Sequence, residues 1–154
     1  MNLTAVTAPD LMLPRLAAGS REEAIRLAAS RLAAAEGVPA DVLADEILAR
    51  ERERETDLGL GVAIPHTRSE VMARTRLLVA TLATPLPTRD PDQEPVDVML
   101  LIAGPRREPR TLLQVLARTV RLLRRDGFLA DLRAAATPAD LWEAFRRHAG
   151  PAES

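Results

Sequence analysis

Helical periodicity marks the first third of the chain. Residues 21–36 and 39–53 each place apolar side chains three and four positions apart, a spacing typical of amphipathic helices. Ser20 and Glu23 form a capping box before the first stretch, and Gly37 supplies a stop after it. The apolar positions are Ile25, Ala28, Leu32, Val42, Leu43, Ile47 and Leu48. We predict helices over 21–36 and 39–53.

The middle of the chain favours strands. Residues 77–83 and 96–103 are nearly all apolar, which is typical of strands buried on both faces. Residues 11–13 and 62–64 are shorter candidates. Three prolines in 85–91 remove N–H groups that a sheet ladder needs, so we predict a loop there.

The last third returns to helical spacing. Residues 110–126 carry an apolar face and end at Gly127, and residues 128–132 begin a short helix. Thr137 followed by Pro138 is the start signal of a last helix. This order of elements predicts an α/β (α+β) fold, in which a mixed β-sheet is sandwiched between helices on both faces.

Length and composition indicate one compact domain, which we place at residues 1–149, with a disordered tail at 150–154. The 154 residues are 47% hydrophobic and 28% charged. All 21 basic residues are arginines; against 22 Asp and Glu they give a net charge of -1, which favours neither nucleic acid nor an anionic membrane. The run 50–55, which alternates Arg and Glu, predicts a solvated helix face.

Several classes of function are excluded by what the sequence lacks. There is no cysteine, so disulfides, thiolate metal sites and a cysteine nucleophile are ruled out. No apolar run approaches the ~20 residues of a membrane helix. The first residues show neither a basic start nor an apolar leader, so we expect a cytoplasmic protein.

The candidate for chemistry is His66, which follows Gly59, Gly61 and Pro65. A neutral imidazole is a good nucleophile near neutral pH and can carry a phosphoryl group on one ring nitrogen. A hydrogen bond must then hold the other nitrogen, so that the attacking nitrogen keeps its lone pair. On residue types alone, a loop histidine without a role is the alternative.

Other chemistries fit the sequence poorly. The second histidine, His148, is distant, and neither histidine has acidic neighbours at metal-ligand spacing. The Gly59–Gly61 turn lacks the third glycine of a dinucleotide fingerprint and the Gly-Lys-Ser/Thr of a P-loop. None of the serines lies in a nucleophile-elbow motif. We therefore expect no metal and no organic cofactor.

The motif around His66 resembles a known phosphorylation site. Leu48-Ala49-Arg50-Glu51, then Thr56, Gly59 and Gly61, then Ala63-Ile64-Pro65-His66 are similar to the motif of enzyme IIA of the fructose/mannitol class. These proteins belong to the bacterial phosphoenolpyruvate-dependent phosphotransferase system (PTS) and include the nitrogen-regulatory enzyme IIA proteins. The resemblance covers about 11–147.

The resemblance implies that His66 accepts a phosphoryl group as N-phosphohistidine from a phosphorylated HPr-like protein. It implies that Arg50 stabilises the phosphate, and that the two glycines shape the loop under the imidazole. The implied site loop consists of Gly59, Gly61, Pro65 and Thr67.

One position departs from the family pattern. Members commonly carry a second histidine at the start of the helix after the last long strand, and Leu112 stands there in this chain. Arg110 and Thr111 in the same turn remain possible contacts for phosphate or a partner. In addition, Thr67 and Arg68 follow His66 where the family often has glycine.

Two functions follow from the resemblance. In the first, the chain passes phosphate to a IIB component for sugar uptake. In the second, phosphorylation changes binding to a regulatory target protein, and the loss of the second histidine at Leu112 favours this reading. A degenerate relative that is never phosphorylated is a third reading.

Overall fold

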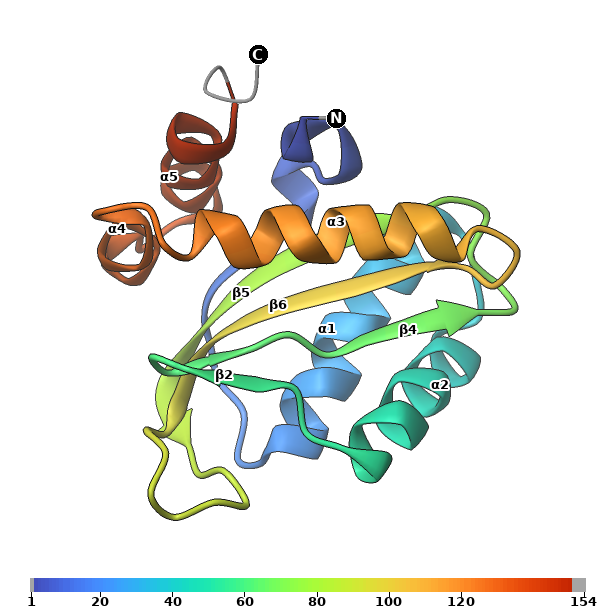
Figure 1. The fold of residues 1–154 in the computed structure, drawn as a ribbon, viewed down its shortest axis with the longest axis horizontal. Coiled ribbons are helices and arrows are strands. Elements are labelled where there is room, and N and C mark those ends of the chain that lie inside the picture. Colours follow the sequence, from blue (N-terminus) through green and yellow to red (C-terminus); the bar gives the residue numbers. More distant parts are fainter. Residues whose placement is uncertain (1, 151–154) are drawn as a thin grey trace.

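The most apolar stretches of the sequence form the two central strands of a mixed sheet in the computed structural model, which describes residues 2–150 (Figure 1). The strands are β1 (Met12–Leu16), β2 (Asp57–Gly59), β3 (Val62–Ala63), β4 (His66–Ser69), β5 (Arg76–Leu86) and β6 (Val96–Pro105). The order is β1-β5-β6-β3-β2, and β4 also pairs with β6. Strand β6 is antiparallel to β5 and parallel to β3 and β4.

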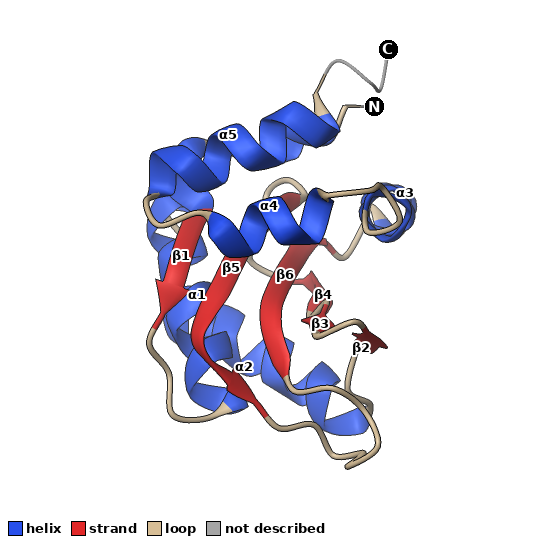
Figure 2. Ribbon diagram, turned by 90° about the vertical axis from the view of Figure 1, so that its left-hand side faces the viewer, coloured by secondary structure: helices blue, strands red, loops and turns tan. Residues whose placement is uncertain are grey.

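Helices cover both faces of this sheet (Figure 2). They are α1 (Arg21–Glu36), α2 (Ala40–Glu53), α3 (Pro109–Leu122), α4 (Phe128–Ala134) and α5 (Pro138–Ala149), preceded by short 3₁₀ turns at Leu3–Val6 and Pro9–Leu11. Helices α1 and α2 lie on one face, and α3, α4 and α5 lie on the other. The predicted α/β fold is confirmed.

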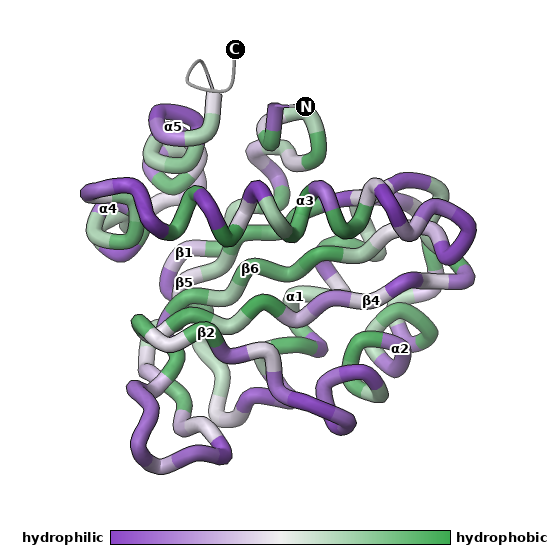
Figure 3. Tube along the Cα trace, in the orientation of Figure 1, coloured by the Kyte–Doolittle hydropathy of each residue, from purple (hydrophilic) through white to green (hydrophobic). Residues whose placement is uncertain are grey.

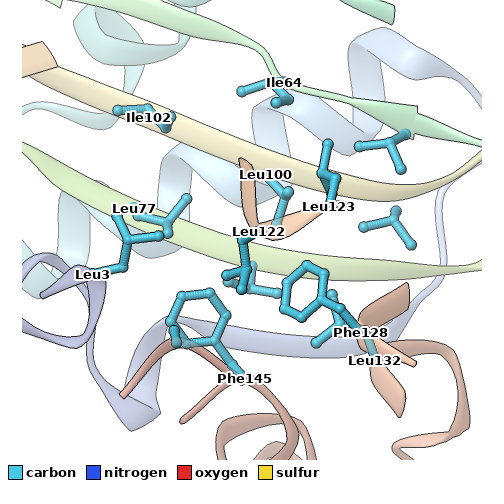
Figure 4. Close-up of a cluster of buried hydrophobic side chains, with 14 of the residues drawn as sticks. Leu3, Ile64, Leu77, Leu100, Ile102, Leu122, Leu123, Phe128, Leu132 and Phe145 are labelled. Carbon is cyan, nitrogen blue, oxygen red and sulfur yellow. The ribbon is translucent and has the colours of Figure 1, made fainter. Parts of the chain in front are cut away.

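Side-chain alternation along the central strands builds two separate cores. Leu77 and Leu100 face the α3–α5 layer, where they pack with Phe128 and Phe145 (Figure 4). Their neighbour Leu78 faces the α1–α2 layer. Figure 3 shows apolar residues concentrated along β6, and polar residues in the loop between β5 and β6. A strand that serves two cores must be apolar throughout, which explains why these strands were predictable.

Helix α1 has the bounds that its capping signals predict. The Ser20 hydroxyl accepts from the Glu23 N–H at 3.1 Å, and the Glu23 carboxylate accepts from the Gly19 N–H at 2.6 Å. Gly37 ends the helix in the left-handed region, with φ 69°.

Some local predictions need correction. The strands β2 and β4 were not predicted, because each is short and lacks the apolar run that marked the other strands. Strand β5 continues through Pro85, where we predicted only a loop; a register shift between Thr81 and Leu86 releases this part of the strand from regular pairing, so a missing N–H is tolerated. Helix α3 ends at Leu122 and tighter turns follow it, whereas we predicted that it extends to 126.

The two ends of the described chain meet. Asn2 donates to the carbonyl of Gly150 at 2.9 Å, and Gly150 is buried. Residues 151–154, the rest of the predicted tail, lie outside the described residues. Within 2–150, none of the helices has the length and apolar character needed to cross a membrane.

Candidate active site

A hairpin leads the chain to His66. The turn between β2 and β3 places Gly59, Leu60 and Gly61 at φ 78°, 59° and 77°, a region that glycine enters at little cost. Gly61 also lies so close to Asp97 and Arg133 that an added Cβ would come within 2.9 Å of the Asp97 carboxylate. The glycines therefore shape the hairpin.

Strand β6 fixes where His66 lies. Val62 of β3 pairs with Val98, and His66 of β4 pairs with Ile102, four residues further along β6. Just before His66, the Pro65 carbonyl accepts from the Ile102 N–H at 3.0 Å. The four residues of β6 from Val98 to Ile102 span about 13 Å at ~3.3 Å per residue, and this length separates the end of the glycine turn from His66.

The imidazole of His66 is held by one hydrogen bond. Its Nδ1 lies 2.8 Å from the carbonyl oxygen of Ile64. Because a carbonyl can only accept, this contact places the proton of the neutral ring on Nδ1 and leaves a lone pair on Nε2. The side chain is half-buried, so Nε2 is available as a nucleophile.

His66 opens into a cleft of about 610 Å³ between α2, β4 and the start of α3. In Figure 1, β4 runs between these two helices. The lining residues are Glu46, Ala49, Arg50, Glu53, His66, Thr67, Arg68, Arg106, Pro109, Leu112 and Leu113. We call this the His66 cleft. A second cleft of about 260 Å³ shares His66 and Arg50 with it and extends toward Leu116 and Val120 of α3.

Three guanidinium groups reach the His66 cleft. Arg50 lies 3.7 Å from Glu53, and Arg106 pairs with Glu70 at 2.7 Å. Arg68 is exposed and forms no ion pair with any residue in 2–150. The cleft can therefore offer positive charge and N–H donors to an anion bound beside the imidazole.

The cleft also holds a carboxylate that is already engaged. Glu46 of α2 accepts from the Ser69 hydroxyl at 2.6 Å and from the Glu70 N–H at 2.8 Å. These bonds fasten α2 to the end of β4, so that this helix keeps a fixed distance from the strand that carries His66.

The structure brings only part of the predicted site together. His66, Arg50 and Thr67 line the His66 cleft, and Pro65 is buried next to them. Gly59 and Gly61 do not line it. Arg110 is exposed and Thr111 is half-buried, and neither lines the cleft.

Leu112 does line the cleft, at 5% exposure, in the place where the resemblance led us to expect a histidine. Sequence reasoning missed Glu46, Arg68 and Arg106 as cleft residues. Arg68 stands two positions after His66, and alternate residues of a strand share a face, so only a prediction of strand β4 would have placed Arg68 beside the imidazole. None of the groups of His, Asp and Glu in 2–150 is arranged to hold a metal ion.

Residues 6–148 match the family model for the phosphoenolpyruvate-dependent sugar phosphotransferase system, EIIA 2, and the chain belongs to this family. The resemblance drawn from the sequence is confirmed.

Individual relatives fall into two groups. A nitrogen regulatory protein of Bradyrhizobium diazoefficiens is 33% identical over 134 residues, which are 87% of this chain and 88% of the relative. The 2-O-alpha-mannosyl-D-glycerate-specific EIIABC component of Escherichia coli is 34% identical over 148 residues, 94% of this chain but 22% of the relative. The family thus includes both regulatory and sugar-specific proteins.

Solved structures share the fold. The nitrogen regulatory protein IIA-Ntr from Neisseria meningitidis superposes with a TM-score of 0.81 at 19% identity, over 91% of this chain and 96% of that one. The mannitol enzyme IIA of Escherichia coli, solved in complex with phosphorylated enzyme IIB, superposes with a TM-score of 0.74 at 20% identity. The match covers 91% of this chain and 96% of that one.

Proposed function

We propose that this chain is a phosphocarrier in which Nε2 of His66 accepts a phosphoryl group from a phosphorylated HPr-like protein. The observation that carries the proposal is the hydrogen bond from Nδ1 to the Ile64 carbonyl, which leaves the Nε2 lone pair free. The family membership of the chain supports it as well.

The transfer of the phosphoryl group between the two histidines requires no proton movement. The Nε2 lone pair forms the new N–P bond while the N–P bond of the donor phosphohistidine breaks, and that electron pair returns to the donor ring. The proton stays on Nδ1, which continues to donate it to the Ile64 carbonyl. Such a transfer depends on alignment and on neutralising the phosphoryl oxygens, which Arg50 and Arg68 can do from the walls of the cleft.

The destination of the phosphate is the second part of the proposal. One route leads to a IIB component, as in the complex of the mannitol relative with its phosphorylated IIB. The other ends at a regulatory target protein. Leu112 favours the regulatory route, because a leucine offers no ring nitrogen to assist onward transfer. The similarity to nitrogen regulatory proteins points the same way.

The test is phosphoryl transfer from phosphoenolpyruvate through enzyme I and HPr, compared between the unmodified chain, His66→Gln and His148→Gln. We expect acid-labile, base-stable label in the unmodified chain and in His148→Gln, because His148 lies on α5, contacts Asp131 through Nε2 and does not line the cleft. His66→Gln should fold and take no label. Equal labelling of His66→Gln would refute the acceptor role.

Adding a candidate IIB protein to the labelled chain then separates the two routes. Rapid loss of label to the IIB protein indicates sugar transport. Label that stays on the chain while its affinity for a target protein changes indicates regulation.

A further inference from the structure

Glu51 and Arg50 are neighbours in the last turn of α2, but only Arg50 faces the His66 cleft. The Glu51 side chain is 7% exposed, so the prediction of a solvated face for the whole Arg/Glu run is wrong at this position. Its carboxylate accepts from Arg21 Nε at 2.8 Å through one oxygen and from the Thr56 hydroxyl at 2.9 Å through the other. A buried carboxylate therefore holds Thr56.

The ion pairs of Arg21 make this anchor firm. Arg21 lies at the start of α1 and also contacts Asp57 at the start of β2, so it ties three elements together. Burial opposes the charge on Arg21, but the hydrogen bond to Asp57 and the attraction of Glu51 outweigh it and raise its pKa. The guanidinium therefore remains charged and keeps the Glu51 carboxylate in place.

Thr56 connects the buried Glu51 carboxylate to the imidazole of His66 through backbone hydrogen bonds. It lies between α2 and β2, outside both elements, and its carbonyl accepts from the Ile64 N–H at 2.9 Å. The Ile64 carbonyl in turn accepts from Nδ1 of His66 at 2.8 Å. A continuous series of hydrogen bonds thus connects Glu51 to His66 through Thr56 and Ile64.

We propose that Thr56 and Glu51 are positioning residues that hold the Ile64 carbonyl in place and so fix the tautomer of His66. If the Thr56 hydroxyl is removed, the segment that binds the Ile64 N–H loses its anchor. The Ile64 carbonyl can then turn away, and His66 can adopt the tautomer with its proton on Nε2. That tautomer has no lone pair on Nε2 and cannot attack phosphorus through this nitrogen. The consequence for phosphorylation rests on the proposed function, whereas the effect on the tautomer does not.

The alternative is that these residues only stabilise the fold. A purely structural role would lower the free energy of unfolding without changing which nitrogen of His66 carries the proton. The tautomer is therefore the decisive readout. Nitrogen-15 NMR distinguishes a protonated from an unprotonated ring nitrogen, and His148, whose Nε2 is held by Asp131 at 2.7 Å, gives an internal reference in the same spectrum.

The experiment compares ¹⁵N-histidine spectra of the unmodified chain, Thr56→Val and Thr56→Ser. Each spectrum is recorded at a pH at which the His66 ring is neutral. Valine keeps the shape of threonine without the hydroxyl, and serine keeps the hydroxyl. We expect a single Nδ1–H form in the unmodified chain and in Thr56→Ser, and a mixture in Thr56→Val. We also expect labelling by saturating phosphorylated HPr to slow about fivefold in Thr56→Val, since one hydrogen bond contributes about 1 kcal/mol.

Three results would overturn the inference. They are an Nε2–H form already dominant in the unmodified chain, an unchanged tautomer in folded Thr56→Val, and equal losses in Thr56→Val and Thr56→Ser. Thr56→Ala replaces Thr56→Val if valine disturbs the fold. If His66 takes no label even in the unmodified chain, the proposed function fails, and the spectra still decide the positioning role.

Discussion

Leu112, buried in the first turn of α3, shares one cleft with His66 at the start of β4. The leucine belongs at the same time to the core beneath α3. This position therefore serves packing, where the resemblance predicted a second histidine for transfer. Under the proposed function, leucine offers no polar group beside His66, and the neutralisation of a phosphoryl group falls to the arginines of the cleft.

Leu112→His should restore a ring nitrogen beside His66. We expect faster onward transfer to a IIB protein, together with a loss of about 2 kcal/mol in the free energy of unfolding, because a polar ring replaces a buried leucine. Leu113→His is the matched control: it lines the same cleft at 63% exposure and should cost within about 0.5 kcal/mol. Denaturant titration and transfer assays measure the two effects. Unchanged transfer in folded Leu112→His would show that the second imidazole is not what limits this step.

Arg50→Gln should slow labelling of His66 about tenfold, since a charge-assisted hydrogen bond to the phosphoryl group would be lost. Arg52→Gln is the control on the same helix, because Arg52 is exposed and does not line the cleft. The measurement is the initial rate of label transfer from phosphorylated HPr. Equal slowing of the two variants would instead point to a general effect of the charge of α2 on donor docking.

Arg68→Gln tests a residue that sequence reasoning overlooked. It stands two positions after His66 on β4, lines the cleft and forms no ion pair within 2–150, so it is available to bind phosphate. We expect labelling to slow about fivefold, and unchanged labelling in Arg107→Gln, an exposed residue outside the cleft. A rate equal to that of the unmodified chain would leave Arg50 and Arg106 as the arginines that can bind phosphate in the cleft.

The parts of the fold that the sequence predicted are those with local causes. Helix α1 begins where Ser20 and Glu23 cap it, and α5 begins where the Thr137 hydroxyl accepts from the Asp140 N–H at 3.1 Å. The strands β5 and β6 were predictable because both of their faces are buried. Each of these signals lies within a few residues of the element that it specifies.

The parts that were missed depend on distant partners. Strand β4 covers only four residues and is a strand because His66 pairs with Ile102 of β6. Without that strand, nothing placed Arg68 on the same face as His66. Likewise Glu51 looked like part of a solvated run, and only its contact with Arg21, thirty positions earlier, shows that it is buried. Long-range pairing therefore decided the composition of the candidate site.

The lowered pKa of Glu36 predicts how the stability of the protein depends on pH. Hydrogen bonds from Arg74 lower the pKa of the Glu36 carboxyl, despite the opposing effect of burial. A lowered pKa in the folded state stabilises the protein above the ordinary glutamate pKa of about 4.3, and this contribution is lost as the pH falls through the folded value. In Glu36→Gln the free energy of unfolding should therefore fall less steeply below about pH 4.

Glu36→Gln should also destabilise the protein at neutral pH. The side chains of Glu36 and Arg76 are 7% and 9% exposed, and the variant leaves the Arg76 charge without its partner at 3.3 Å. We expect a loss of about 3 kcal/mol. Glu143→Gln, which breaks an exposed pair with Arg146, should change stability by less than about 0.5 kcal/mol. Parallel pH slopes for Glu36→Gln and the unmodified chain would mean that Glu36 keeps its ordinary pKa.

The variants Gly61→Ala and Gly59→Ala distinguish two reasons for glycine in the β2–β3 turn. One is the positive φ, and the other is the lack of space for a Cβ. Both positions have positive φ, so a methyl group at either costs about 1 kcal/mol. Around Gly59 nothing lies within 4 Å of the added Cβ, whereas at Gly61 it would come within 2.8 Å of Arg133 Nη2. We expect Gly61→Ala to lose about 3 kcal/mol in total, because the Arg133–Asp97 pair must move.

Denaturant unfolding of both glycine variants provides the measurement, with labelling of His66 as the second readout. Neither glycine lines the His66 cleft, so the fraction of each variant that remains folded should accept phosphate at the rate of the unmodified chain. A large loss of labelling in well-folded Gly59→Ala would show that the turn acts directly at the imidazole, as the sequence resemblance implied. Equal stability losses in the two variants would mean that backbone strain alone explains both glycines.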